Sequence, residues 1–208
     1  SNWAVSSPII VDNNLYCYAG KQLLKINKET GDIIASAPMA GNSSFGINPP
    51  CYGGGMIFVG LAGGAVQAFN AETLESLWVF KDTLGGQPNC TIQYSDGYIY
   101  TGFWNSETKD ANFVCVSATD EDPDNPTETK YATWTYAVQG GFYWAGAYVT
   151  DKYAIVGSDD GESDSTSDSS YVYCFDKLTG EVVQKVGPHH GDIRSDISYY
   201  DGRIYFTS

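Results

Sequence analysis

The sequence predicts an all-β protein, a β-propeller of four-stranded antiparallel blades. Short apolar runs alternate with tight polar turns, and Gly (23) and Tyr (16) are abundant among the 208 residues. The same pattern also recurs along the chain. The second strands of the repeats are expected to start at Leu15, Met56, Tyr98, Tyr153 and Arg203, in steps of 41 to 55 residues. A period of this length with four strands per unit is typical of a propeller.

The clearest unit lies at residues 56–80. MIFVG precedes a tight turn at 61–64, AVQAFN precedes a polar corner at 71–73, and LWVF closes the meander. A meander of this size cannot bury its faces alone. The same unit is therefore expected to recur along the chain. The sequence predicts four full repeats and part of a fifth within one propeller domain or segment, at residues 8–40, 49–86, 90–138, 146–187 and 196–208.

The strands of the other repeats follow the same order. Repeat one contains PIIVD, LYCYA, QLLKIN and DIIASAP, with Asn and Gly at turns that need positive φ. Repeat three contains CTIQYS, YIYTGFW, NFVCVS and ATWTYAV, and long loops, one of them acidic, separate its later strands. Repeat four contains GAYVT, YAIVG, SYVYCFD and EVVQKV, and the partial repeat contains DISYY and RIYFTS. The leading WAV fits the fourth strand of a blade, without the rest of its repeat.

Composition excludes several classes of function. The net charge is −14, which argues against binding a phosphate backbone, since that needs clustered Lys and Arg. No apolar stretch is long enough for membrane insertion. The five cysteines are widely spaced without a CxxC pair, so no zinc site is predicted. Reduced thiols are expected, with one internal disulfide as the alternative.

A two-part unit recurs along the chain. Its first part, an Asp-Gly turn leading into a strand, occurs at 96–102 and 201–205, and its second part, a strand ending in a polar corner, occurs at 68–73 followed by Trp78 and at 174–180. This unit resembles the repeat of the pyrroloquinoline-quinone-type, or quinoprotein-like, β-propellers. The resemblance implies that a Trp fills the seam between blades and that a Thr-Gly corner closes the hairpin of the third and fourth strands. The residues that fit these structural roles are Trp3, Trp78, Trp134 and Gly180, while Ala35 and Gln184 replace the seam Trp in repeats one and four.

The resemblance also bears on cofactors and on the size of the ring. The quinone enzymes of this family carry two adjacent cysteines, and this chain has no Cys-Cys pair, so pyrroloquinoline quinone is not expected and no cofactor is predicted. Family propellers usually have more blades, which favours a segment of a larger propeller over a small closed ring. An open arc would expose strand edges, and a homodimer that pairs them is a further expectation.

Candidate binding residues lie in the loops from the fourth strand to the next blade and from the second strand to the third. In a propeller these loops share one face. Exposed aromatic residues with polar neighbours mark sites for sugars or peptides. The alternative is that some of these side chains pack between blades. The candidates are Phe45, Gln87, Trp104, Phe142, Tyr143, Trp144, His189, His190 and Asp192.

The acidic loop at 158–168 superficially resembles a calcium loop, with Asp159, Asp160 and Asp164 as candidate ligands. It lacks the Asp-x-Asp-x-Asp-Gly order with a closing Glu, so a solvated loop is favoured over a calcium site. The chain also lacks a GxSxG elbow, an HExxH motif and a phosphate loop, which argues against catalysis.

We therefore expect a non-catalytic interaction or adhesion scaffold with a protein or glycan partner. The family resemblance implies an extracytoplasmic location, in the periplasm or at the cell surface. One alternative is a carbohydrate- or peptide-binding module that uses the aromatic rim. The other is a fragment of a quinone-dependent dehydrogenase.

Overall fold

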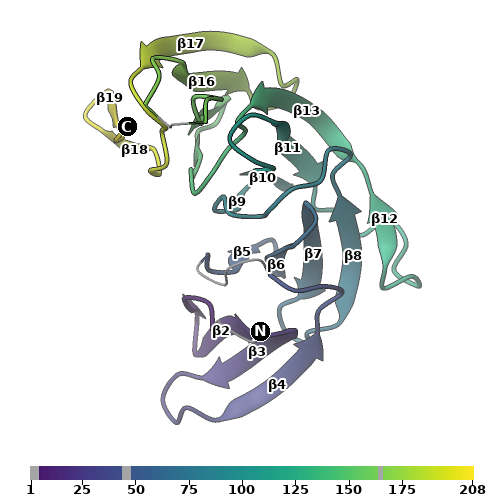
Figure 1. Ribbon diagram of the computed structural model, residues 1–208. Coiled ribbons are helices and arrows are strands. Elements are labelled where there is room, and N and C mark those ends of the chain that lie inside the picture. The colour runs from purple at the N-terminus through teal and green to yellow at the C-terminus, as the bar shows by residue number, and fades with distance from the viewer. Residues whose placement is uncertain (1–4, 44–47, 164–165) are drawn as a thin grey trace.

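The computed structural model describes residues 5–43, 48–163 and 166–208, in which strands are the regular secondary structure (Figure 1). Four antiparallel blades and a final hairpin stand side by side along an open arc, with the first blade and the hairpin at opposite ends of the arc. Within these ranges there is no helix with the length and apolar character needed to cross a membrane. The β-propeller architecture expected from the sequence is confirmed, and the sheets do not close into a ring.

Each blade runs from an inner strand on the concave side of the arc to an outer strand on its convex side (Figure 1). Blade 1 comprises β1 (Ile9–Val11), β2 (Asn14–Ala19), β3 (Gln22–Asn27) and β4 (Ile33–Pro38). Blade 2 comprises β5 (Cys51–Gly53), β6 (Met56–Leu61), β7 (Ala65–Asn70) and β8 (Ser76–Lys81). Blade 3 comprises β9 (Gln93–Ser95), β10 (Tyr98–Gly102), β11 (Asp110–Ser117) and β13 (Ala132–Gln139). Blade 4 comprises β14 (Tyr148–Val149), β15 (Tyr153–Gly157), β16 (Ser170–Asp176) and β17 (Val182–His189), and the hairpin comprises β18 (Ser198–Tyr200) and β19 (Arg203–Tyr205).

The strand register repeats from blade to blade. One apolar residue of the third strand pairs with the same position of the second strand in all four blades, and a bulge next to it shifts the fourth strand by one residue. Ile26, Phe69, Val116 and Phe175 occupy that position. The fourth-strand residues that face the preceding position are Ala35, Trp78, Trp134 and Gln184.

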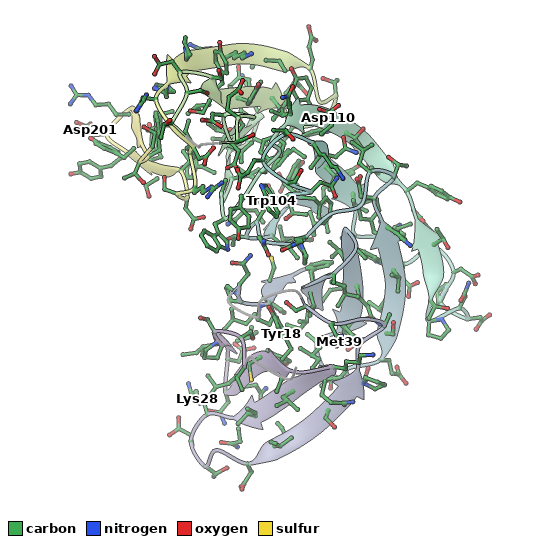
Figure 2. The ribbon with its side chains drawn as sticks, viewed as in Figure 1. Tyr18, Lys28, Met39, Trp104, Asp110 and Asp201 are labelled. Carbon is green, nitrogen blue, oxygen red and sulfur yellow. The ribbon has the colours of Figure 1, made fainter. Side chains whose placement is uncertain are left out.

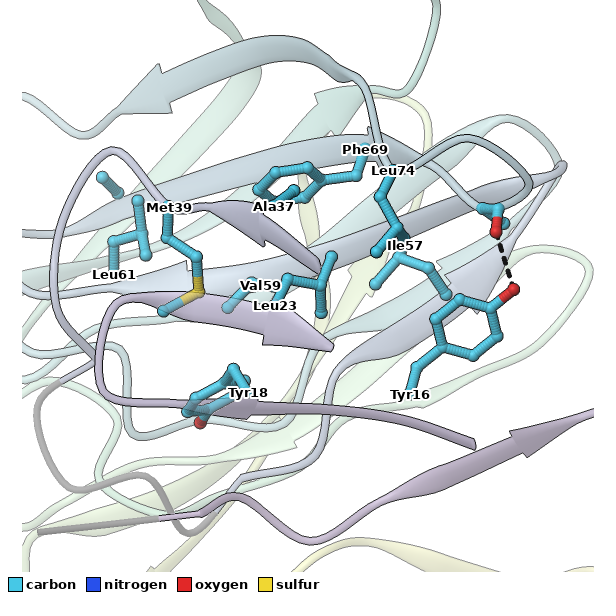
Figure 3. Packing of buried hydrophobic residues seen from close by; sticks show 12 residues of the cluster. Tyr16, Tyr18, Leu23, Ala37, Met39, Ile57, Val59, Leu61, Phe69 and Leu74 are labelled. Carbon is cyan, nitrogen blue, oxygen red and sulfur yellow. Dashed lines mark hydrogen bonds between the residues drawn. The ribbon is translucent and has the colours of Figure 1, made fainter. Parts of the chain in front are cut away.

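The hydrophobic core is divided among the seams between neighbouring blades. At the first seam, Leu23 of blade 1 and Ile57 and Phe69 of blade 2 are fully buried in one cluster (Figure 3). Tyr16 belongs to the same cluster, and its hydroxyl donates a 2.6 Å hydrogen bond to the carbonyl oxygen of Ala71 (Figure 3). Tyr16 therefore supplies an interblade hydrogen bond in the blade whose fourth strand has Ala35 in place of Trp.

The next two seams use tryptophan for the same purpose. The Trp78 indole Nε1–H of blade 2 donates to the carbonyl of Ala118 in blade 3 at 3.1 Å. The Trp134 indole of blade 3 donates to the carbonyl of Lys177 in blade 4 at 2.9 Å. Ala118 and Lys177 follow the last residue of the third strand, as Ala71 does in blade 2, so one corner carbonyl is the acceptor at all three seams.

Local side-chain bonds fix this corner. In blades 1, 2 and 4, the side-chain oxygen of Asn27, Asn70 or Asp176 accepts the backbone N–H groups two and three residues further on, at 2.8–3.1 Å. This is the Asx turn that Asn and Asp favour. At the corner of blade 4, Gly180 has φ +75°, and a Cβ there would lie 2.5 Å from the Trp134 ring. Gly180 therefore allows both the turn and the close approach of the seam tryptophan.

The sequence predicts only a loop between the third and fourth strands of repeat three. This prediction was wrong for the end of the acidic loop, which forms a short strand. β12 (Glu128–Lys130) pairs in parallel with β8 and covers the outer edge of blade 2. Lys130 anchors it, since its buried ammonium lies 2.7 Å from both the Thr119 carbonyl and Glu121 Oε2. Covering an apolar edge strand prevents unwanted strand pairing. A three-residue segment between polar turns carries no periodic pattern that could have predicted it.

All five cysteines are free, as expected. Burial raises the pKa of every one of these thiols, to about 12 for Cys51 and about 11 for Cys115. Because the thiolate is the reactive form, buried thiols of raised pKa are inert.

We expect the native protein to react slowly with a thiol-specific disulfide reagent at pH 8, and all five thiols to react once the protein is unfolded in urea. Absorbance of the released chromophore measures both. Rapid reaction of several thiols in native buffer would show that the seams open readily.

Replacing the seam tryptophan should destabilise the arc. Trp134→Ala removes a buried ring and leaves the Lys177 carbonyl without its indole donor, at an expected cost of about 3–5 kcal/mol. The matched control is Gln184→Ala, which changes the same strand position in blade 4, where the side chain is exposed, and should cost less than about 0.5 kcal/mol. Urea unfolding followed by circular dichroism compares the two. Equal unfolding midpoints for both variants would contradict the seam assignment.

Candidate functional site

Loops from blades 3 and 4 bring three aromatic rings together. Trp104 follows β10, while Tyr143 and Trp144 lie between β13 and β14. The ring centroids of Trp104 and Tyr143 are 4.6 Å apart, and those of Tyr143 and Trp144 are 4.2 Å apart, both stacked. Trp104 lies on the concave side of the arc (Figure 2). The stack thus joins the second-to-third-strand loop of one blade to the junction with the next.

Backbone contacts hold the aromatic residues in place. Gln87 and Trp104 exchange two backbone hydrogen bonds, of 2.7 and 3.2 Å. The neighbouring Phe142 N–H donates to the Phe103 carbonyl at 2.9 Å. Trp144 has φ +57° and is 41% exposed. A positive φ is uncommon for a bulky residue and marks backbone strain.

A charged cluster adjoins the aromatic stack, centred on Arg194 from the loop between β17 and β18. Its Nη2 nitrogen lies 3.0 Å from Glu107 Oε2, 2.8 Å from Asp159 Oδ2 and 2.9 Å from Asp192 Oδ2. Its Nε also donates to Asp159 Oδ1, so the Asp159 pair is bidentate. The guanidinium carbon lies 4.6 Å from the centre of the Tyr143 ring. We call Trp104, Tyr143, Trp144, Glu107, Asp159, Asp192 and Arg194 the rim cluster.

The three carboxylates differ in accessibility. The side chain of Asp159 is 0% exposed, that of Asp192 is 5% exposed and that of Glu107 is 34% exposed. Burial raises the pKa of Asp159 to about 7, although Arg194 opposes this shift. Burial also raises the pKa of Asp192. Glu107 is therefore the carboxylate of the cluster that a ligand could reach.

The carboxylates do not fit a metal ion as they stand. Their oxygens lie within 4.8 Å of one another, but the Arg194 guanidinium binds all three. Asp160, another candidate ligand, accepts the backbone N–H groups of Glu162 and Ser167 at 2.8 and 3.0 Å and so closes its own loop. Asp164 lies outside the described residues. A cation would have to displace Arg194 to reach this group.

The aromatic stack does not fit a planar quinone cofactor either. A ring inserted between two others needs about 7 Å between the outer rings, twice the carbon contact distance. The centroid separations of 4.6 and 4.2 Å leave no such gap. The chain also lacks the adjacent cysteines of the quinone enzymes it resembles.

The other rim candidates are placed elsewhere. Phe142 is fully buried and packs against Phe113 at 5.4 Å, so its expected role on the rim was wrong: it is a core residue, because the turn before it directs it inward. His189 packs edge-on against Phe206, and His190 Nδ1 lies 2.8 Å from exposed Asp168. Phe45 and Trp3 lie outside the described residues.

Sequence reasoning missed Arg194 and Glu107. Each lies in a loop with other charged residues, and nothing in the spacing links them, since 87 positions separate them. One signal was available: Arg194 is one of only two arginines in the chain, and it lies in a loop expected on the same face as the aromatic residues.

Comparison with known proteins agrees with a propeller of quinoprotein-type repeats. A family described as "Outer membrane protein assembly factor BamB" matches residues 2–107, about half of the chain. The chain therefore belongs to this family of PQQ-type-repeat β-propellers. Comparison with curated protein sequences gave no match.

Solved structures show the same fold. Quinohemoprotein alcohol dehydrogenase from Comamonas testosteroni matches with a TM-score of 0.68 at 15% identity, over 99% of this chain and 39% of that one. The related enzyme ADHIIG from Pseudomonas putida HK5 matches with a TM-score of 0.68 at 14% identity, over 99% and 38%. A europium-containing methanol dehydrogenase matches with a TM-score of 0.66 at 11% identity, over 88% and 41%. The chain thus spans about two fifths of each of these structures.

The buried carboxylate of the rim cluster predicts a pH dependence of stability. A native pKa of about 7, against an ordinary value of 3.8, means that the folded state binds this proton more tightly than the unfolded state does. Stability from this group is therefore greatest below about pH 4 and declines as the pH rises toward 7. In Asp159→Asn, which cannot titrate, the decline in free energy of unfolding between pH 5 and 8 should be smaller.

Urea titrations of both proteins at several pH values measure this dependence. Equal changes in the free energy of unfolding between pH 5 and 8 for wild type and Asp159→Asn would contradict the raised pKa, because a carboxylate that Arg194 keeps ionised over this whole range contributes no pH dependence there.

Proposed function

We propose that this chain is a non-catalytic scaffold that works outside the cytoplasm and binds a protein partner through the rim cluster. The observation that carries the proposal is Trp144, a large apolar side chain left 41% exposed on a strained backbone. Such strain costs on the order of 1–3 kcal/mol and persists where the surrounding structure enforces it, often at functional sites.

The surroundings of Trp144 suit a binding surface. Its ring is held by the stack on Tyr143 and hence on Trp104, so little side-chain freedom remains to be lost on binding. Trp and Tyr are also the residues most enriched where binding energy concentrates in interfaces. The rigid seams beneath, with their interblade hydrogen bonds, keep loops from different blades in register.

The family match supports a protein partner and the location. Its description is that of an assembly factor for outer membrane proteins, a role that requires binding other proteins. We favour a scaffold over a quinone-dependent dehydrogenase for two reasons. The aromatic rings stack on one another and leave no gap for a quinone, and Arg194 binds the carboxylates that a metal ion would need.

Capture from the cell envelope of the source organism tests the proposal. The immobilised chain should retain a protein that Trp144→Ala loses, with at least about a thirtyfold fall in affinity, as for an interface hot spot. Tyr131→Ala is the matched control, because Tyr131 is an aromatic residue that is 81% exposed and follows directly after β12, a strand on the convex side of the arc. The retained protein is then purified and its binding measured by calorimetry.

Three outcomes would overturn the proposal. Equal retention by wild type and Trp144→Ala would remove the rim cluster from the interface. Binding on a glycan array, with no protein partner, would favour the carbohydrate-binding alternative. A change in the absorbance of added pyrroloquinoline quinone, with alcohol oxidation, would favour the dehydrogenase alternative. Light scattering of each variant shows whether a homodimer forms through the open edges instead.

A further inference from the structure

The charge of the rim cluster restricts the kind of partner. Three carboxylates surround one guanidinium in the rim cluster, so negative charge is in excess there. Glu107, the accessible member, is linked to the stack through Arg194, which bonds Glu107 and packs over Tyr143. The whole chain carries a net charge of −14, which adds to the negative potential.

The aromatic rings of the cluster already hold one cation. The Arg194 guanidinium lies 4.6 Å from the centre of the Tyr143 ring, within the range of a cation–π contact. Tyr143 stacks in turn on Trp144, and indole is the ring that attracts cations most strongly. The exposed part of the Trp144 ring therefore presents the same chemistry to solvent, and Tyr143 links it to Arg194 and the carboxylates that Arg194 binds.

We propose that the protein partner presents a basic segment to this surface, with a Lys or Arg side chain packed on Trp144 and drawn by Glu107. This inference rests on the proposed function and deepens it. An acidic segment would meet the carboxylates with like charge, and a purely apolar one would gain nothing from Glu107. A cationic side chain uses both the indole face and the charge.

Fluorescence anisotropy with two labelled peptides tests this inference. Both are twelve residues long and alternate Gly or Ser with a charged residue, Lys in one and Glu in the other. The Lys peptide should bind at least tenfold more tightly than the Glu peptide at 50 mM salt. Trp144→Ala should weaken the Lys peptide about threefold to tenfold, the scale of a cation–π contact, and Glu107→Gln should weaken it to a similar extent.

A control separates this site from general attraction to an acidic protein. Asp122→Asn with Asp124→Asn removes two exposed charges from the loop that leads into β12, and it keeps the rim cluster intact. β12 itself lies on the convex side of the arc (Figure 1). This double variant should change the affinity for the Lys peptide less than twofold. If it weakens binding as much as Trp144→Ala does, or if Trp144→Ala has no effect, the inference is overturned.

The inference and the proposed function can fail separately. If a captured partner depends on Trp144 while the Lys peptide binds no better than the Glu peptide, the rim is an interface but the basic segment is wrong. If neither the partner nor the peptide depends on Trp144, both fail.

Discussion

The interblade hydrogen bond is the interaction on which the rest of this structure depends. At each of three seams, an aromatic side chain of one blade donates to the carbonyl that follows the third strand of the next blade. Tyr16 does so at the first seam, and Trp78 and Trp134 do so at the other two. A blade of this size cannot bury its own faces, so the core of the protein consists of these seams, and each seam fixes the position of the next blade.

The seams also explain where a functional site can form. Because they hold blades 3 and 4 in register, loops distant in sequence meet on one face, and Trp104, Tyr143 and Arg194 come into contact there. The cost of this arrangement is local. Trp144 takes a strained backbone angle, and the Asp159 carboxylate is buried at a raised pKa. Leu74 also has a positive φ, +61°, but it lies at the repeated corner of blade 2, whereas the rim cluster combines a positive φ at exposed Trp144 with a buried carboxylate.

Much of the fold could be predicted from the sequence because it depends on local signals repeated several times. Alternation, Gly turns and the Asx corners recur with one period, and the register that places Ala35 and Gln184 at the seam position followed from that period. β12 could not be predicted, because its pairing with β8 depends on a buried lysine and a loop with no pattern of its own. The substitute donor at the first seam, Tyr16, was missed for a similar reason: it lies on a different strand from the tryptophans it replaces.

Prediction of the site was less complete, because single residues decide it. The propeller topology predicts that the loops with Trp104, Tyr143 and Trp144 share one face. It does not predict that Phe142 is buried while its neighbour Tyr143 joins the aromatic stack, because the local turn decides the direction of each side chain. Arg194 and Glu107 meet only after folding. The direct test of the account is hydrogen exchange of the indole N–H groups, observed by ¹⁵N NMR. The account predicts that those of Trp78 and Trp134 exchange only through global unfolding, while that of exposed Trp144 exchanges rapidly. Exchange of the two seam indoles as fast as that of Trp144 would contradict it.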